Sequence, residues 1–214
     1  MKVSIYVNAH KALVIPIVLG LMWIHGNWST EAFIYLSLHG TYSILWLIKQ
    51  SVYPDRRFDE LQPVWIGTLF IFFPLAGYYA APYLLLSRHV ALPPYLTGMV
   101  LVLFIVGMFL HYVSDAQKYF TLKFRAGLID EGLFSRTRNP NYLGEILIYA
   151  SLALMSLHWL PFLILAGWTF GYFFRNMRKK DRSLSRFTQF GAYKQRTGLL
   201  LPRLRGMKAG RLTS

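Results

Sequence analysis

Hydrophobic and polar residues alternate along this chain in long blocks. The apolar blocks cover residues 12–24, 32–48, 64–86, 92–113, 146–155 and 160–174. A helix needs about 20 mostly apolar residues to cross roughly 30 Å of hydrocarbon. Several blocks reach this length, and the shorter ones reach it with their flanking residues. The pattern therefore predicts an all-α integral membrane bundle of about six transmembrane helices.

The composition supports this interpretation. Of the 214 residues, 55% are hydrophobic and only 15% are charged, whereas a soluble domain carries roughly a quarter of charged residues. The chain shows no internal repeat and no low-complexity segment, so residues 1–214 are predicted to form a single transmembrane domain. The absence of cysteine excludes disulfides and thiol catalysis, and we expect no metal site.

Basic residues gather in alternate connections between the blocks. The net charge is +14, and residues 175–214 alone hold twelve Lys and Arg against one acid. Because cytoplasmic loops carry an excess of Lys and Arg, we expect both termini to be cytoplasmic. The segment 175–190 is predicted to form a basic cytosolic C-terminal helix. Since topology accounts for the charge, we expect membrane lipids as partners and no nucleic acid.

The first polar cluster ends the fourth apolar block. His111, Asp115 and Lys118 are spaced so that they share one face of a helix. An ionisable group at the membrane boundary usually faces the bundle interior and is a functional candidate. A solvated helix end, in which Asp115 pairs with Lys118, would explain the same pattern without a function.

The second polar cluster opens the fifth block. Asn139 is suited to cap a helix, and Pro140 is suited to its first position, where a missing N–H costs nothing. Asn141, Glu145 and Tyr149 then fall on one face of that helix. The structural alternative is a buried ion pair between Glu145 and a nearby arginine; the candidates are Arg138, Arg175 and Arg178.

The two clusters flank one basic loop, and both can meet the basic tail. Arginine forks and helix N-termini bind phosphate or carboxylate, whereas Asp115 and Glu145 can accept hydrogen bonds from ribose hydroxyls or an amide. An anionic nucleotide-like cofactor fits this mixture. Anionic lipid headgroups would explain the arginines but not the carboxylates.

Three motifs lie between residues 97 and 202. They are Gly107-Met…Ser114-Asp115, Gly132-Leu-Phe…Asn141-Tyr-Leu-Gly-Glu-Ile146, and Arg138-Asn139-Pro140-Asn141-Tyr142-Leu-Gly144. The first two resemble the steroid 5α-reductase superfamily. The third is also similar to a motif of the related isoprenylcysteine carboxyl methyltransferases, with Asn139 in place of a histidine. Asp115 followed by Gln117-Lys118 looks like the bacterial reductase-like branch, so we expect a bacterial inner membrane in preference to the endoplasmic reticulum.

The resemblance implies a division of labour along the chain. Residues 97–214 are expected to bind NADPH, or S-adenosylmethionine if the methyltransferase likeness holds, and residues 1–96 to hold the substrate. His111 and Arg182 stand where the family has asparagine and histidine, and both keep a hydrogen-bond donor. The implied cofactor contacts are His111, Asp115, Lys118, Arg138, Asn141, Tyr142, Glu145, Tyr149, Arg178 and Arg182.

The substrate side departs from the reductase pattern. The reductases polarise an enone carbonyl with an early glutamine–glutamate pair, but the best local match here is Asn8-Ala9. We expect His10 and Tyr42 to be the catalytic residues instead, because a neutral histidine can donate a hydrogen bond. Tyr6 and His39 are alternatives. A lone histidine in a membrane helix can equally be a packing residue.

Three functions follow from these patterns. The leading hypothesis is an NADPH-dependent reductase of a lipophilic, steroid- or enone-like substrate. The second is methyl transfer from S-adenosylmethionine to a lipid. The third is a non-enzymatic bundle whose basic face binds anionic lipid or a partner, since a fold can persist after its chemistry is lost. The substrate and the oligomeric state are left open.

Overall fold

The computed structural model describes residues 1–203, except for the side chains of Arg56 and Arg57. The last part of the predicted basic tail, 204–214, lies outside the described residues. Within residues 1–203 the regular elements are all helices, and the β-pairing is limited to isolated bridges such as that between Lys2 and Leu61. The prediction of an all-α membrane bundle is confirmed.

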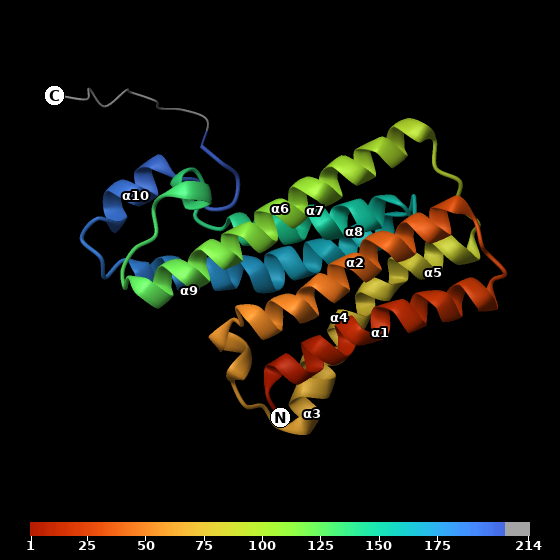
Figure 1. Ribbon diagram of the computed structural model, residues 1–214, viewed down its shortest axis with the longest axis horizontal. Coiled ribbons are helices and arrows are strands. Elements are labelled where there is room, and N and C mark those ends of the chain that lie inside the picture. Colours follow the sequence, from red (N-terminus) through yellow and green to blue (C-terminus); the bar gives the residue numbers. More distant parts are fainter. Residues whose placement is uncertain (204–214) are drawn as a thin grey trace.

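The first two helices form an antiparallel hairpin. Helix α1 spans Val3–Ile24 and α2 spans Thr30–Val52. Gly26, at φ +59°, allows the tight turn between them. Ser29 caps α2 by accepting a hydrogen bond from the Ala32 N–H at 3.3 Å. The hairpin places the first 52 residues as one wall of the bundle (Figure 1).

The third apolar block forms one irregular rod, Val64–Ser87. It consists of α3 (Val64–Gly67), a π-helical turn (Thr68–Phe72), α4 (Phe73–Ala76), a 3₁₀ turn (Gly77–Tyr79) and α5 (Ala80–Ser87). Pro74 removes one backbone donor from the rod, which favours such departures from α-helical bonding. The irregular turns therefore fall in the middle of an otherwise apolar helix.

Helices α6 (Pro94–Phe124) and α7 (Pro140–Leu154) pack closely along their length. Glycines make this approach possible. A Cβ on Gly144 would lie 2.4 Å from the backbone nitrogen of His111, and one on Gly107 would lie 2.8 Å from the carbonyl oxygen of Gly144. The seam between α6 and α7 therefore requires glycine at both positions.

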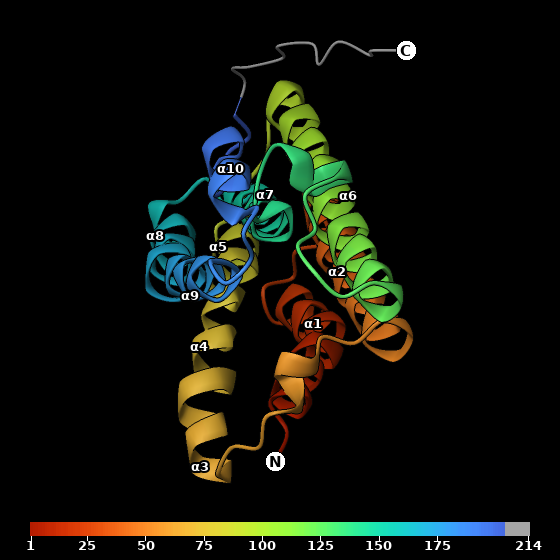
Figure 2. The same cartoon turned by 90° about the vertical axis from the view of Figure 1, so that its left-hand side faces the viewer.

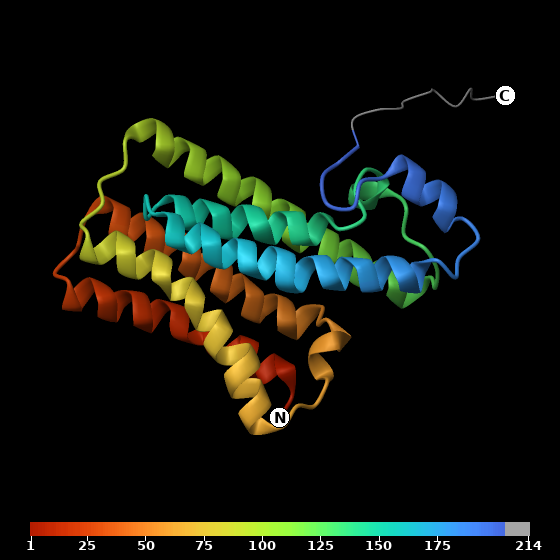
Figure 3. The ribbon, with the colours of Figure 1, turned by 180° about the vertical axis from the view of Figure 1, so that it is seen from behind.

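The C-terminal helices differ from the prediction. Helix α8 (Trp159–Trp168), a π-helical turn (Thr169–Phe173) and α9 (Phe174–Leu184) follow without interruption and form one rod, visible in Figure 3. The predicted basic helix 175–190 is therefore present only in its first part, because the helix ends at Leu184. Its first part continues the sixth apolar block, and a turn then leads to the short α10 (Phe190–Arg196).

The connections separate into two groups at opposite ends of the bundle (Figures 1 and 3), and Figure 2 views the molecule from the end that carries α10. The segments 25–29, 88–93 and 155–158 lie at one end, and the basic segments 125–139 and 185–203 lie at the other. Among the described residues, three stretches have the length and hydropathy of membrane spans: Val3–Ile24, Val64–Ser87 and Pro94–Phe124. The chain is thus a membrane protein, while the count of six spans and the cytoplasmic placement of both termini stay predictions.

Candidate functional site

The seam between α6 and α7 brings together part of the predicted cofactor set. His111 Nδ1 lies 3.3 Å from the backbone carbonyl of Asn141, within hydrogen-bond distance. Asp115 follows His111 by one helical turn, and Glu145 follows Asn141 in the same way. Among the described residues, His111 Nε2 and Asp115 Oδ1 are buried and have no hydrogen-bond partner. Two polar atoms at this seam are therefore open to a ligand or to water.

Asp115 also belongs to a buried ion pair that the sequence did not reveal. Its Oδ2 is in contact with Nζ of Lys49 on α2, and both side chains are almost fully buried. Lys118 pairs with Asp55, Nζ to Oδ2, at 3.2 Å. Burial raises the pKa of the nearby Tyr53 phenol, and the negative charge of Asp115 adds to this rise. The alternative pairing of Asp115 with Lys118 is replaced by two pairs that join α6 to α2 and to the segment after it.

Arg138 is the centre of a second buried site, at the start of α7. Its Nε donates to Asp181 on α9 at 3.0 Å, and its Nη1 donates to the carbonyl of Thr197 at 2.8 Å. The Tyr193 hydroxyl donates to the Phe134 carbonyl at 3.0 Å, and burial raises the pKa of Tyr193 to about 12, which keeps this donor protonated. We call this group, Arg138, Asp181, Tyr193 and Thr197, the arginine latch. It fastens α9 and α10 to the start of α7.

Asn139 acts differently from the prediction. Its side chain makes no capping bond to α7. Instead its Nδ2 donates to the carbonyl of Leu199 at 2.8 Å, and its Oδ1 accepts from Lys180 at 3.2 Å. Asn139 thus occupies the N-cap position of α7, as predicted, but the expected side-chain bond is absent, because long-range partners compete successfully for the amide. Pro140 does occupy the first turn of α7, as predicted.

The remaining predicted cofactor residues lie in two different settings. Tyr142 is buried, and its ring packs against Phe173 with 4.9 Å between the ring centroids. Arg178 and Arg182 are exposed on α9, on the same face as Arg175. The structure thus presents a basic stripe to the surroundings, whereas the guanidinium of Arg138 is committed to the latch.

A third polar site lies in the interior of the bundle, and its centre is Lys11 on α1. Nζ of Lys11 donates to the Tyr149 hydroxyl on α7 at 2.8 Å and lies 3.9 Å from the centre of the Tyr42 ring. Glu145 acts on the ammonium through its charge. His39, one turn before Tyr42 on α2, is also fully buried. We call Lys11, His39, Tyr42, Tyr78 and Tyr149 the lysine cluster.

The two predicted catalytic residues fall in or next to this cluster. Tyr42 lies under the ammonium of Lys11. His10 is fully buried, with its ring 5.0 Å from that of Tyr79. Of the alternatives, His39 belongs to the cluster, but Tyr6 lies away from it, with its hydroxyl 3.3 Å from the carbonyl of Val64. Asn8, at the family's glutamine position, accepts a hydrogen bond from Trp46 Nε1 at 3.2 Å.

Sequence reasoning missed Lys11, although a signal was present. The apolar block 12–24 begins directly after Lys11, so the hydrophobic pattern places Lys11 outside the membrane span, as a flanking charge. The helix in fact begins at Val3, so Lys11 lies in its third turn. Its buried stripe runs through Val7, Lys11, Val14 and Val18, at helical spacing. A lysine in such a stripe identifies a buried charge.

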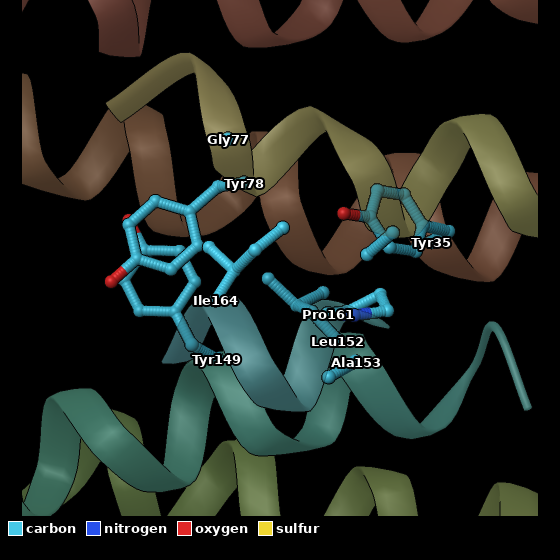
Figure 4. A pocket seen from close by; sticks show the side chains of 9 residues that line it. Tyr35, Gly77, Tyr78, Tyr149, Leu152, Ala153, Pro161 and Ile164 are labelled. Atoms are coloured by element: carbon cyan, nitrogen blue, oxygen red, sulfur yellow. The ribbon is translucent and has the colours of Figure 1, made fainter. Parts of the chain in front are cut away.

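A small pocket adjoins the lysine cluster (Figure 4). The rings of Tyr78 and Tyr149 stack at one side of it, with 3.7 Å between their centroids. Leu152 and Ile164 contribute apolar walls. The pocket has room for about one water molecule in this conformation, so a larger ligand would require the helices to move apart.

The seam of α6 and α7 carries groups that suit parts of a dinucleotide. Asp115 Oδ1 can accept from a ribose hydroxyl, and His111 Nε2 is an imidazole nitrogen without a partner among the described residues, although both atoms are buried in this conformation. Arg178 and Arg182 are placed on the exposed face of the rod and can pair with phosphates. Arg138 does not fit this role, because its donors are used within the protein.

Comparison with known proteins gives one family. The family model described as a protein of unknown function (DUF1295) matches residues 28–197, which include α2 to α10 but not α1. This is a family of steroid 5α-reductase-like proteins. No curated protein and no solved structure matches the chain.

Proposed function

Because the chain belongs to the DUF1295 family of steroid 5α-reductase-like membrane proteins, we propose that it is an NADPH-dependent reductase. Its substrate is lipophilic and carries a C=C bond conjugated to a carbonyl. One observation carries the proposal beyond the family. A buried polar cluster forms where α1 and α2 meet α7, and Lys11 joins Tyr149 across that boundary. Ionisable groups inside a membrane bundle are costly and mark functional sites.

The proposed division of the chain follows this boundary. Residues 1–96 form the substrate side, and 97–214 form the cofactor side. A lipophilic substrate enters laterally from the bilayer, whose hydrocarbon faces the exposed apolar residues of the helices. The basic end of the bundle, with both termini, faces the cytoplasm of a bacterial cell, where NADPH is present. This orientation follows the excess of Lys and Arg at that end.

On the cofactor side, NADPH supplies a hydride. Asp115, Asn141 and Glu145 on the seam orient its ribose and amide groups. Arg178 and Arg182 neutralise its phosphates, because arginine forks match phosphate oxygens in pairs. The arginine latch acts indirectly by holding α9 against the start of α7, so that the basic stripe keeps its position relative to the seam.

On the substrate side, a polar donor must act on the carbonyl oxygen. Charge develops on this oxygen during reduction, and a preorganised donor in a water-free site stabilises that charge. Tyr42 and His10 are the candidates for this donor that the sequence pattern offers in place of the missing glutamate. The buried setting of both residues excludes water from the reacting groups.

The test is thermal unfolding of the detergent-purified protein with each cofactor. We expect NADPH to raise the unfolding midpoint and NADH to raise it much less. At an NADPH concentration 100 times its dissociation constant, the free energy of unfolding should rise by about 2.7 kcal/mol. Arg178→Ala should weaken the effect. Arg125→Ala is the matched control, because Arg125 is an exposed arginine at the same end, paired with the exposed Glu131.

Two outcomes would reject the reductase. Stabilisation by S-adenosylmethionine alone would assign the methyltransferase reaction. Stabilisation by neither cofactor, together with a midpoint that responds to anionic lipid, would assign a non-enzymatic lipid-binding role. If Arg178→Ala and Arg125→Ala weaken the stabilisation by NADPH equally, the basic stripe is not part of the cofactor site.

A further inference from the structure

Lys11 is buried in a span without a complete set of partners. Its side chain is 3% exposed, in the third turn of α1. An ammonium has three donors. In the described part of the chain, one donates to the Tyr149 hydroxyl, and the ring centres of Tyr42 and Trp46 lie 3.9 and 5.4 Å from the ammonium. Burying an ammonium is costly, and here a single hydrogen bond and aromatic ring faces offset that cost.

Some polar atoms around Lys11 also lack hydrogen-bond partners among the described residues. His39 Nδ1 lies 3.2 Å from the Tyr35 hydroxyl, but His39 Nε2 has no hydrogen-bond partner among the described residues. The Tyr78 hydroxyl has none either. Most buried polar atoms in proteins are hydrogen-bonded, so several open atoms in one place indicate a ligand or water that completes them.

Four segments converge on this point. Lys11 comes from α1, His39 and Tyr42 from α2, Tyr149 from α7, and Tyr78 from the 3₁₀ turn of the irregular rod. Figure 4 shows the hydroxyls of Tyr78 and Tyr149 at the same edge of their stacked rings. The adjoining pocket is walled by apolar side chains. A ligand with one polar oxygen on an apolar body matches this combination.

We propose that Lys11, together with the Tyr149 hydroxyl, binds the carbonyl oxygen of the lipophilic substrate and neutralises the charge that develops on it. This inference rests on the proposed reductase function. It assigns to α1 the role that the family's glutamate has, although α1 lies outside the matched region 28–197. Lys11 would thus be the principal electrophile, and Tyr42 the ring that holds its ammonium.

The reaction balances with this assignment. The bound cofactor would supply a hydride to the β carbon, and the electrons of the C=C bond would then move onto the carbonyl oxygen to give an enolate. The ammonium of Lys11 pairs with that oxygen. A proton from Nζ then passes to the α carbon, the saturated ketone is restored, and water on the Glu145 side returns a proton to the amine. Glu145 is half-buried and acts on Lys11 through its charge.

The experiment is infrared spectroscopy of the protein in lipid nanodiscs, without NADPH. The probe is cholest-4-en-3-one labelled with ¹³C at the carbonyl. We expect the wild-type protein to shift the labelled carbonyl band to lower wavenumber. Lys11→Met should abolish the shifted band and weaken probe binding about tenfold or more, which is the typical cost of losing a charged hydrogen bond. Tyr149→Phe should reduce the shift.

Lys2→Met is the matched control, because Lys2 precedes α1 and pairs with Asp59 at the exposed end. It should leave the band as in the wild type. If Lys11→Met does not fold, Tyr149→Phe and Lys11→Gln serve as the second test. The assignment is overturned if wild type and Lys11→Met give the same band or if the wild type gives no shifted band. Equal competition by the carbonyl-free cholest-4-ene, or stronger competition by oleate, overturns it as well.

The NADPH thermal shift, measured on the same samples, separates the two proposals. A cofactor shift without a carbonyl shift overturns the role of Lys11 and leaves the reductase standing. A carbonyl shift without a cofactor shift supports the lysine site and rejects the reductase.

Discussion

The molecule buries two strong cations, Arg138 and Lys11, in very different ways. Arg138 is surrounded by acceptors: Asp181 binds its Nε, and the carbonyl of Thr197 binds Nη1. Lys11 has one hydrogen bond, to the Tyr149 hydroxyl, and the faces of the Tyr42 and Trp46 rings. Both side chains are nearly fully buried.

The difference in pairing distinguishes a structural role for Arg138 from a functional role for Lys11. A buried cation that is fully paired holds segments together, because removing it strands its partners. A buried cation with spare donors costs stability and is retained for another reason. By this criterion the arginine latch fixes the C-terminal helices, and the lysine cluster is the proposed reactive centre. Three predictions test the contrast through stability, in decreasing order of effect.

Arg138→Met should have the largest effect. It leaves the carboxylate of Asp181, whose side chain is 15% exposed, without its counter-charge, and it leaves the Thr197 carbonyl without a donor. Loss of one partner of a buried pair costs about 3–5 kcal/mol. The measurement is the thermal unfolding midpoint in detergent, with protease sensitivity of residues 185–203 as a local readout. An unchanged midpoint would remove the latch as a structural element.

Asn139→Ala should cost about 1–2 kcal/mol, because it strands the Leu199 carbonyl and removes the Lys180 contact. Asn139→Asp distinguishes this role from helix capping. Aspartate caps as well as asparagine does, but it has no N–H for Leu199. Aspartate retains an oxygen for Lys180, so destabilisation by Asn139→Asp reports on the Leu199 contact and supports the structure, whereas wild-type stability of Asn139→Asp would favour a capping role.

Lys11→Met should have the smallest effect, within about 1 kcal/mol, or should raise the unfolding midpoint. Methionine fills the space of the lysine stem, and it removes the cost of holding an ammonium away from water. A loss of stability as large as that of Arg138→Met would show that Lys11, like Arg138, has a structural role, and would contradict the contrast between the two cations.

Parts of the site could be predicted from local spacing alone. His111 and Asp115 share a face of α6, and Pro140 occupies the first turn of α7, because helical geometry and the chemistry of proline fix both. Asn139 shows where local rules end. Its sequence position suits a cap, but Leu199, 60 residues away, accepts its hydrogen bond. No local pattern contains that partner.

The sequence by itself determined that the chain is an all-helical membrane protein with a basic end. Hydrocarbon tolerates only long apolar segments whose backbone bonds are internal, so block length and loop charge are sufficient. Only the tertiary structure decided which charges meet: Lys49 with Asp115, 66 residues apart, and Lys11 with Tyr149, 138 apart. Such pairs depend on how the helices are rotated and packed, and glycine contacts such as Gly107 with Gly144 set that packing.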